Sequence, residues 1–153
     1  MTMRPLIVAI DGPAGAGKST VSKILARRLH FVLVDTGAIY RCVALKARRE
    51  AIAFDDDARL GELLAGLNID FRLEDEGEVN HVLLDGEDVS DAIRTPENSM
   101  AASQVSGRPV VRNGLLELQR RLALNAKTGS ILEGRDIGTV VFPDADEIGR
   151  AHV

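Results

Sequence analysis

The sequence predicts an α/β protein whose core is a parallel sheet and which carries a smaller antiparallel unit. An apolar run at Leu6–Ile10 leads through a glycine-rich turn into apolar residues at helical spacing, and the run Phe31–Asp35 leads into a second such pattern. This strand-helix-strand-helix order is typical of parallel sheets, because parallel strands need crossover helices. At Ile69–Leu73 the period changes to alternation, which indicates a strand of an antiparallel unit.

The glycine-rich turn after the first strand fits the phosphate-loop pattern G-x-x-x-x-G-K-S/T. Glycines let successive backbone N–H groups turn inward around an anion, and the N-terminus of the following helix adds partial positive charge at the same point. The pattern predicts a nucleoside triphosphate site, with ATP as the nucleotide. We expect it to be formed by Gly12, Pro13, Ala14, Gly15, Ala16, Gly17, Lys18, Ser19 and Thr20.

Two side chains at the end of this loop have distinct expected roles. Lys18 can reach the β- and γ-phosphates, and the Ser19 hydroxyl can ligate a Mg²⁺ ion that bridges them. The helix that begins here carries four apolar residues at the spacing of one helical face, namely Val21, Ile24, Leu25 and Leu29.

Polar residues follow the second predicted strand at its carboxyl end, where open parallel sheets bind ligands. They are Asp35, Thr36, Tyr40 and Arg41. Asp35 or Thr36 could instead cap the helix that follows, and either could do both. Further along, Ile131–Glu133 predicts another short strand, which would aim Glu133, Arg135 and Asp136 at the same crevice.

The middle of the chain predicts helices around the antiparallel unit. The run Asp55–Asp57 precedes a helical pattern, and we interpret these acids as helix caps in preference to a metal cluster. Asp85-Gly86 is a hairpin signal. Thr95-Pro96 predicts a helix N-terminus, with a helix to about Val105, and Pro109 predicts the start of another. The antiparallel unit, approximately residues 62–95, is expected to be a lobe inserted over the site.

Composition limits the classes of protein that remain. The formal net charge of −4 and the sequence pI near 5.4 argue against nucleic-acid binding, and no window of the sequence approaches a membrane span. Cys42 is the single cysteine, expected as a small buried hydrophobe, and the three histidines have no metal-ligand spacing. We therefore expect a cytoplasmic, monomeric protein without nucleic-acid or membrane partners and with no metal besides Mg²⁺.

Four segments together resemble the bacterial cytidylate (CMP) kinases. They are Asp11–Thr20, Asp35–Arg41, Ala102–Val105 together with Arg112, and Glu133–Asp144. The first alone indicates only a phosphate loop, whereas the other three are more specific. The resemblance implies a P-loop nucleoside monophosphate kinase-like fold of three layers, in which the antiparallel meander is part of the monophosphate-binding region. It also implies the reaction of ATP with CMP or dCMP to give ADP and CDP or dCDP, with Mg²⁺.

The resemblance assigns roles to individual residues. Arg41 and Arg135 would hold the acceptor phosphate, because guanidinium groups match phosphate oxygens in two-point contacts. Ser103, Arg112 and Asp136 resemble the family's cytosine-binding set, in which an acid can accept from the exocyclic amine that uracil lacks. With Lys18, the two phosphate-binding arginines form the expected catalytic set, and the expected CMP-binding set is Asp35, Thr36, Tyr40, Arg41, Ser103, Arg112, Arg135 and Asp136.

The sequence also departs from the family. Glu133 stands where relatives often have aspartate. The resemblance stops near Asp146, so residues 1–146 are expected to be an incomplete core that lacks the last strands and the arginine-bearing lid. Residues 147–153 match nothing in the family and are interpreted as an artefactual tail. On the family's sheet order, the strand Leu6–Ile10 would become an exposed edge and the chain would be inactive and poorly folded.

Two alternatives remain open on the residues alone. Another small P-loop kinase could act on a different monophosphate or on a small hydroxyl acceptor. A regulatory module could bind ATP without turnover, although no guanine- or effector-reading segment is visible in the sequence.

Overall fold

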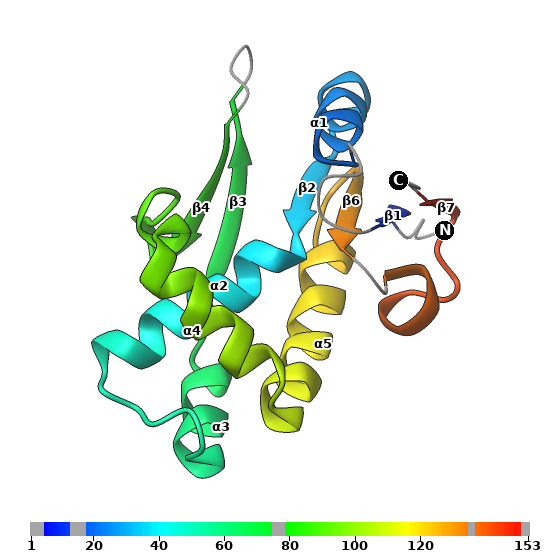
Figure 1. The fold of residues 1–153 in the computed structure, drawn as a ribbon. Helices are drawn as coiled ribbons and strands as arrows, with labels where there is room; N and C mark the ends of the chain where they lie inside the picture. The colour runs from blue at the N-terminus through cyan, green and yellow to red at the C-terminus, as the bar shows by residue number, and fades with distance from the viewer. Residues whose placement is uncertain (1–4, 13–17, 75–78, 135–136, 151–153) are drawn as a thin grey trace. The chain divides into compact units, whose positions relative to one another are not determined.

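The computed structural model describes residues 5–12, 18–74, 79–134 and 137–150 (Figure 1). The chain divides into two compact units, which are described separately. Unit 1 comprises Met1–Thr36, Phe71–Asn80 and Gln119–Val153, and unit 2 comprises Gly37–Asp70 and His81–Leu118.

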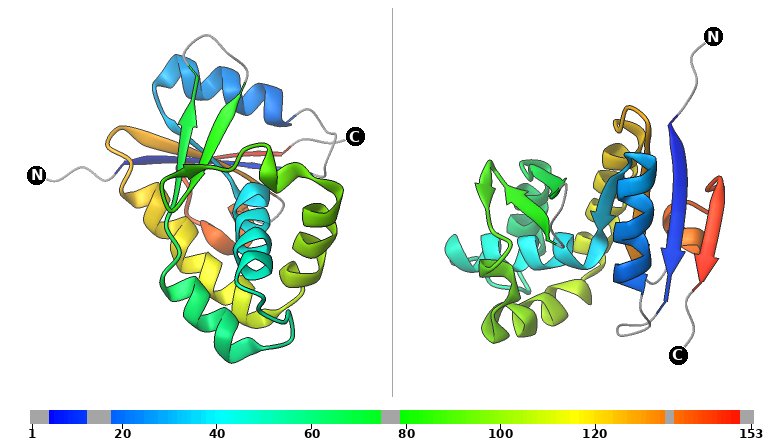
Figure 2. Two further views of the ribbon diagram at one scale, coloured as in Figure 1. Left: turned by 90° about the vertical axis from the view of Figure 1, so that its left-hand side faces the viewer. Right: turned by 90° about the horizontal axis from the view of Figure 1, so that it is seen from above.

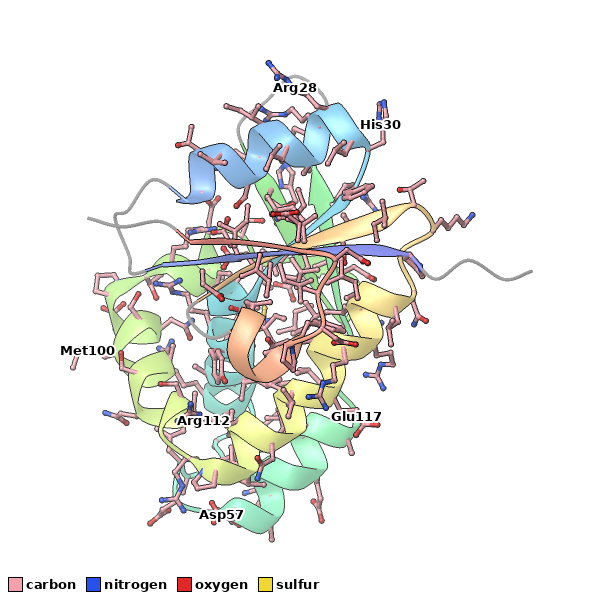
Figure 3. All side chains as sticks on the ribbon, turned by 90° about the vertical axis from the view of Figure 1, so that its right-hand side faces the viewer. Arg28, His30, Asp57, Met100, Arg112 and Glu117 are labelled. Carbon is pink, nitrogen blue, oxygen red and sulfur yellow. The ribbon has the colours of Figure 1, made fainter. Side chains whose placement is uncertain are left out.

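Unit 1 is built on a parallel sheet with the strand order β2-β6-β1-β7. The helix α1 packs on one face of this sheet, and the short helical turn η2 lies against the other (Figure 3). The elements are β1 (Leu6–Asp11), α1 (Lys18–Leu29), β2 (Val32–Asp35), β6 (Gly129–Gly134), η2 (Ile137–Val141) and β7 (Glu147–Arg150). The parallel sheet and the order of its elements confirm the predicted α/β class.

The core of unit 1 lies between α1 and the sheet. Ile10, Leu33 and Ile131 come from three neighbouring strands, and Ala26 comes from the helix. Of the predicted apolar face, Leu25 is partly buried and packs against this core. Val21, Ile24 and Leu29 are 51%, 44% and 45% exposed, whereas Ser22 and Ala26 are buried. Small side chains allow the helix backbone to approach the sheet closely, so the contact face carries the less hydrophobic residues.

The strand β1 is not an edge of the sheet, contrary to the expectation drawn from the family's sheet order. The strand β7 runs parallel to it, with Val8 opposite Glu147 and Asp11 opposite Arg150 (Figure 2). The side chain of Asp146 accepts a hydrogen bond from the Ile7 amide at 2.7 Å, and the Asp146 amide donates to the Ile7 carbonyl at 2.9 Å. Residues predicted to be a tail without family counterpart therefore supply the pairing that covers β1.

Unit 2 is mainly helical. Its elements are α2 (Thr36–Arg49), whose first residue belongs to unit 1, α3 (Asp57–Ala65), η1 (Ala92–Arg94), α4 (Pro96–Ser106) and α5 (Pro109–Leu124), whose last residues belong to unit 1. Two predicted N-caps are confirmed: the Asp56 side chain accepts from the Arg59 amide, and Thr95 accepts from the Asn98 amide. Cys42 is fully buried, as expected.

A second sheet has the order β3 (Ile69–Leu73), β4 (Asn80–Leu84) and β5 (Glu87–Asp88), with β4 and β5 antiparallel. The predicted hairpin turn at Asp85-Gly86 joins them. Both residues have positive φ, 51° and 86°, which is the backbone twist that tight hairpins require. This sheet confirms that an antiparallel unit accompanies the parallel one.

Candidate functional site

Three strands of unit 1 end side by side at the carboxyl edge of the sheet. In the register of the sheet, Asp11 at the end of β1 lies opposite Gly134 at the end of β6, and Asp35 at the end of β2 lies opposite Glu133. One residue further, the Gly12 amide donates to the Gly134 carbonyl at 3.1 Å. The glycine-rich segment and the segment after β6 therefore leave adjacent strands at the edge where parallel sheets bind ligands.

The structure describes the two ends of the phosphate-loop segment, which are Gly12 and Lys18–Thr20. Lys18 is the first residue of α1, and Ser19 and Thr20 follow with exposed side chains. The predicted ATP-binding residues Pro13, Ala14, Gly15, Ala16 and Gly17 lie outside the described residues. The strand-to-helix context that the motif requires is thus present, because β1 ends at Asp11 and α1 begins at Lys18.

The residues near the start of α1 fit a magnesium ion held mostly by a nucleotide. Mg²⁺ usually keeps several water ligands and takes few protein oxygens together with substrate phosphates. The exposed Ser19 hydroxyl offers one such oxygen. Among the described residues, no group of three or more His, Cys, Asp or Glu side chains could hold a metal by itself.

Asp11 is a positioning residue that the sequence reasoning did not single out. Its side chain is 5% exposed, and its two carboxylate oxygens accept hydrogen bonds from the backbone amides of Ile137 and Gly138 at 2.7 and 2.8 Å. The strand that leads into the glycine-rich segment thereby fixes the turn that follows the Arg135–Asp136 segment. The signal in the sequence that could have identified Asp11 is an acid at the carboxyl end of an apolar strand. Its hydrogen-bond partners could not be identified in this way, because they lie 126 and 127 residues further along the chain.

Thr36 and Gly134 show how closely the second helix approaches β6. The buried Thr36 hydroxyl donates to the Glu133 carbonyl at 2.9 Å. A Cβ atom added at Gly134 would lie 2.5 Å from the Thr36 Oγ1 atom, so only glycine fits there without a shift. In this structure the Thr36 hydroxyl ties the start of α2 to β6. The predicted contacts of Thr36 and of the half-buried Asp35 with CMP stay predictions.

In unit 2, Tyr40 and Arg41 lie in the first turns of α2 and are both partly buried. Within the described residues, the Nε atom of Arg41 is buried and has no hydrogen-bond acceptor. A buried N–H donor without an acceptor is costly, so an arginine in this state is suited to an anionic ligand. The carbonyl of Arg41 accepts a hydrogen bond from the side chain of Asn98 at 3.1 Å.

The two described residues of the expected cytosine-binding set are exposed in unit 2. Ser103 lies on α4, where its hydroxyl donates to the Ser99 carbonyl at 3.2 Å. Arg112 lies on α5, the helix that packs on α3 where Gly114 meets Leu64 (Figure 3). Within the described part of the chain no hydrogen bond joins these two side chains, and Arg135 and Asp136 lie outside that part. The set therefore stays a prediction.

The pKa is shifted at three described groups of unit 2, Arg49 at the end of α2 and Glu87 and Asp88 on β5, and none of them is a predicted site residue. The hydrogen bond from Arg49 lowers the pKa of Glu87, and the hydrogen bonds from Ser90 lower the pKa of Asp88. The guanidinium group of Arg49 donates to both carboxylate oxygens of Glu87 at 3.0 Å, and the Lys46 Nζ atom lies 2.9 Å from the Asp85 carboxylate. These pairs fasten the hairpin to α2 and carry no sign of catalytic tuning.

In the described part of the chain, no helix is both long enough and apolar enough to cross a membrane.

Residues 8–147 match the family model described as Cytidylate kinase. A cytidylate kinase of Geobacter sp. (strain M21) is 58% identical over 92% of this chain and 59% of its own length. Those of Syntrophotalea carbinolica and Azotobacter vinelandii are 55% and 43% identical, over 94% and 95% of this chain. The chain spans about three fifths of the length of these relatives, which is 59% for two of them and 62% for the third.

Proposed function

The chain belongs to the cytidylate kinase family. From this membership we propose that the protein to which the chain belongs transfers the γ-phosphoryl group of ATP to CMP or dCMP, giving ADP and CDP or dCDP. The observation that carries the proposal is the meeting of three strand ends. The phosphate-loop segment begins after Asp11 at the end of β1, opposite Gly134 at the end of β6, and the Asp35–Arg41 segment begins at the end of the next strand, β2. The donor and acceptor segments of the family motifs thus start from one edge of one sheet.

On the donor side, Gly12–Thr20 would hold the phosphates of ATP with backbone N–H groups and the N-terminus of α1. Lys18 would contact the β- and γ-phosphates, and Ser19 would be the protein ligand of Mg²⁺. When bound, this ion offsets the negative charge of the phosphates. Lys18 contributes most when charge on the transferring group changes, because a fixed cation stabilises the transition state without reorganisation.

On the acceptor side, Arg41 and Arg135 would hold the phosphate of CMP. The buried Arg41 Nε atom supports this role, because a phosphate oxygen would supply the acceptor that the donor lacks. Asp35, Thr36 and Tyr40 would complete this part of the site. No general base is needed, since the attacking phosphate oxygen of CMP is already ionised, and catalysis consists of positioning and charge stabilisation.

Selection of cytosine would depend on Ser103, Arg112 and Asp136. A carboxylate accepts a hydrogen bond from the exocyclic amine of cytosine and repels the carbonyl oxygen that uracil presents instead. The small β3-β4-β5 sheet belongs to the segment of approximately residues 62–95, which we propose to be the inserted monophosphate-binding lobe.

The proposal is tested with a panel of acceptors. The protein expressed from its natural reading frame is given ATP, Mg²⁺ and equal concentrations of CMP, dCMP, UMP, AMP or GMP, and ADP release is measured. We expect CMP and dCMP to react fastest. Faster turnover of AMP or GMP would refute the cytosine assignment, and ATP binding without acceptor-dependent turnover would favour a regulatory module.

Two substitutions separate the donor and acceptor roles. Lys18→Ala should lower turnover about a hundredfold or more with a smaller change in CMP affinity. Lys23→Ala, on the same helix, is the charge-matched control and should stay near wild type. Asp136→Ala should weaken discrimination between CMP and UMP while sparing ATP binding. Equal damage to ATP binding would assign Asp136 to the donor side.

A further inference from the structure

Unit 2 contains a fully buried asparagine whose amide is completely hydrogen-bonded. Asn98 is 0% exposed and is the third residue of α4. Its Nδ2 atom donates to the Arg41 carbonyl at 3.1 Å and to the Ile93 carbonyl at 2.9 Å, and its Oδ1 atom accepts from the Arg48 Nη1 atom at 3.3 Å. Both amide hydrogens and the amide oxygen are therefore used.

The chemistry of the partners fixes the orientation of this amide. Two backbone carbonyls can only accept, and a guanidinium group can only donate, so the reversed amide would face two acceptors with its oxygen and one donor with its nitrogen. The Asn98 backbone is fixed as well, because its amide donates to the Thr95 hydroxyl in the cap of α4. The side chain thus has one orientation and no freedom to exchange partners.

These bonds join α4 to the part of α2 that carries Arg41. Helix carbonyls can accept a second hydrogen bond besides the one inside the helix, and the Arg41 carbonyl uses this capacity for Asn98. Arg48 lies two turns further along α2 on the same side, so Asn98 contacts α2 at two places. This double contact fixes both the distance of α2 from α4 and the rotation of α2 about its own axis.

We propose that Asn98 is a positioning residue for Arg41. By holding the Arg41 backbone at a set rotation of α2, it keeps the buried Nε atom directed at the place where the acceptor phosphate binds. It also holds α4, and with it Ser103, at a fixed distance from Arg41. This inference rests on the proposed function of Arg41 and adds a residue that does not touch the substrate.

The test compares binding of CMP and of cytidine, which lacks the phosphate, by calorimetry to the protein expressed from its natural reading frame. Asn98→Asp keeps the size and the oxygen that faces Arg48 but can donate to neither the Arg41 nor the Ile93 carbonyl. Because only the Arg41 contact bears on the phosphate, we expect CMP binding to weaken about three- to tenfold, the range of that one hydrogen bond, and cytidine binding to stay unchanged. In an Arg41→Ala background the same substitution should have no further effect on CMP binding, because coupled residues are not additive.

Asn80→Asp is the matched control. Asn80 is also a buried asparagine whose Nδ2 atom donates to a backbone carbonyl, that of Leu33 at 3.0 Å. It should leave the ratio of CMP to cytidine affinity unchanged. Equal losses for CMP and cytidine in Asn98→Asp, or the same loss in the Arg41→Ala background, would overturn the inference by showing a structural effect.

A second readout separates this inference from the proposed function. If CMP binds the wild-type chain no better than cytidine does, the proposed role of Arg41 fails. The positioning effect is then read from the NMR order parameter of the Arg41 Nε–H group. A lower value in Asn98→Asp but not in Asn80→Asp supports positioning by Asn98, and an unchanged value overturns it.

Discussion

Replacing Asp11 tests the anchor that joins β1 to the turn after the Arg135–Asp136 segment. In Asp11→Ala the amides of Ile137 and Gly138 lose their acceptors in a buried place. A buried donor without an acceptor costs about 1–3 kcal/mol, so two of them give a loss of about 2–6 kcal/mol in the free energy of unfolding. For a chain of this size, a loss of about 3 kcal/mol within this range lowers the melting temperature by roughly 6–12 °C.

The assay combines urea unfolding, followed by circular dichroism, with amide hydrogen exchange. The exchange rates of Ile137 and Gly138 should rise about a hundredfold, since each 1.4 kcal/mol is about tenfold. Asp91→Ala is the control, because Asp91 precedes η1 without a side-chain cap hydrogen bond. A loss below about 0.5 kcal/mol in Asp11→Ala, or faster exchange spread evenly over both units, would refute the view that this carboxylate anchors the turn.

Three further predictions follow from other contacts. Gly134→Ala should destabilise the protein by about 1–3 kcal/mol, because the added Cβ meets the Thr36 hydroxyl oxygen at 2.5 Å; a neutral effect in urea unfolding would mean that α2 can shift. The Arg49 hydrogen bond lowers the pKa of Glu87 from 4.5, so this pair stabilises the hairpin above that pH and its contribution is lost as the pH falls through the lowered pKa. An NMR titration midpoint of Glu87 at or above 4.5 would contradict this. Ile24→Gln should change the free energy of unfolding by less than about 0.5 kcal/mol, since Ile24 is 44% exposed; a loss of about 2 kcal/mol would show that the residue is buried in solution.

The local patterns of the sequence predicted most elements of the fold. Asp85-Gly86 determines its turn because both residues tolerate positive φ, and the Thr95-Pro96 pair determines a helix start by capping chemistry. The strand Leu6–Asp11 and the helix from Lys18 follow from hydrophobic period and glycine spacing. These predictions succeeded because the responsible interactions lie within a few residues.

The failures concern interactions between distant residues. The fully buried residues of α1 are Ser22 and Ala26, which the apolar spacing did not select, and Leu25 is the one residue of the predicted face that packs against the core. The strand β7 pairs with β1 across almost the whole length of the chain, and no strand was predicted at Glu147–Arg150. The same applies to the site. Sequence motifs identified the segments that meet at the sheet edge, but Asp11 and Asn98 act through partners that only the folded chain brings to them.

The pairing of β7 with β1 closes the outer side of a buried strand. The residues Val8–Asp11 face β6 on one side and β7 on the other, so their backbone groups are not offered to other extended segments. Two side chains help to hold β7 there: the Asp146 carboxylate accepts from the Ile7 amide, and Ile148 lies so close to Gly138 that an added Cβ would meet it at 2.7 Å. Protection of β1 against strand addition from another chain therefore depends on the last residues that the structure describes.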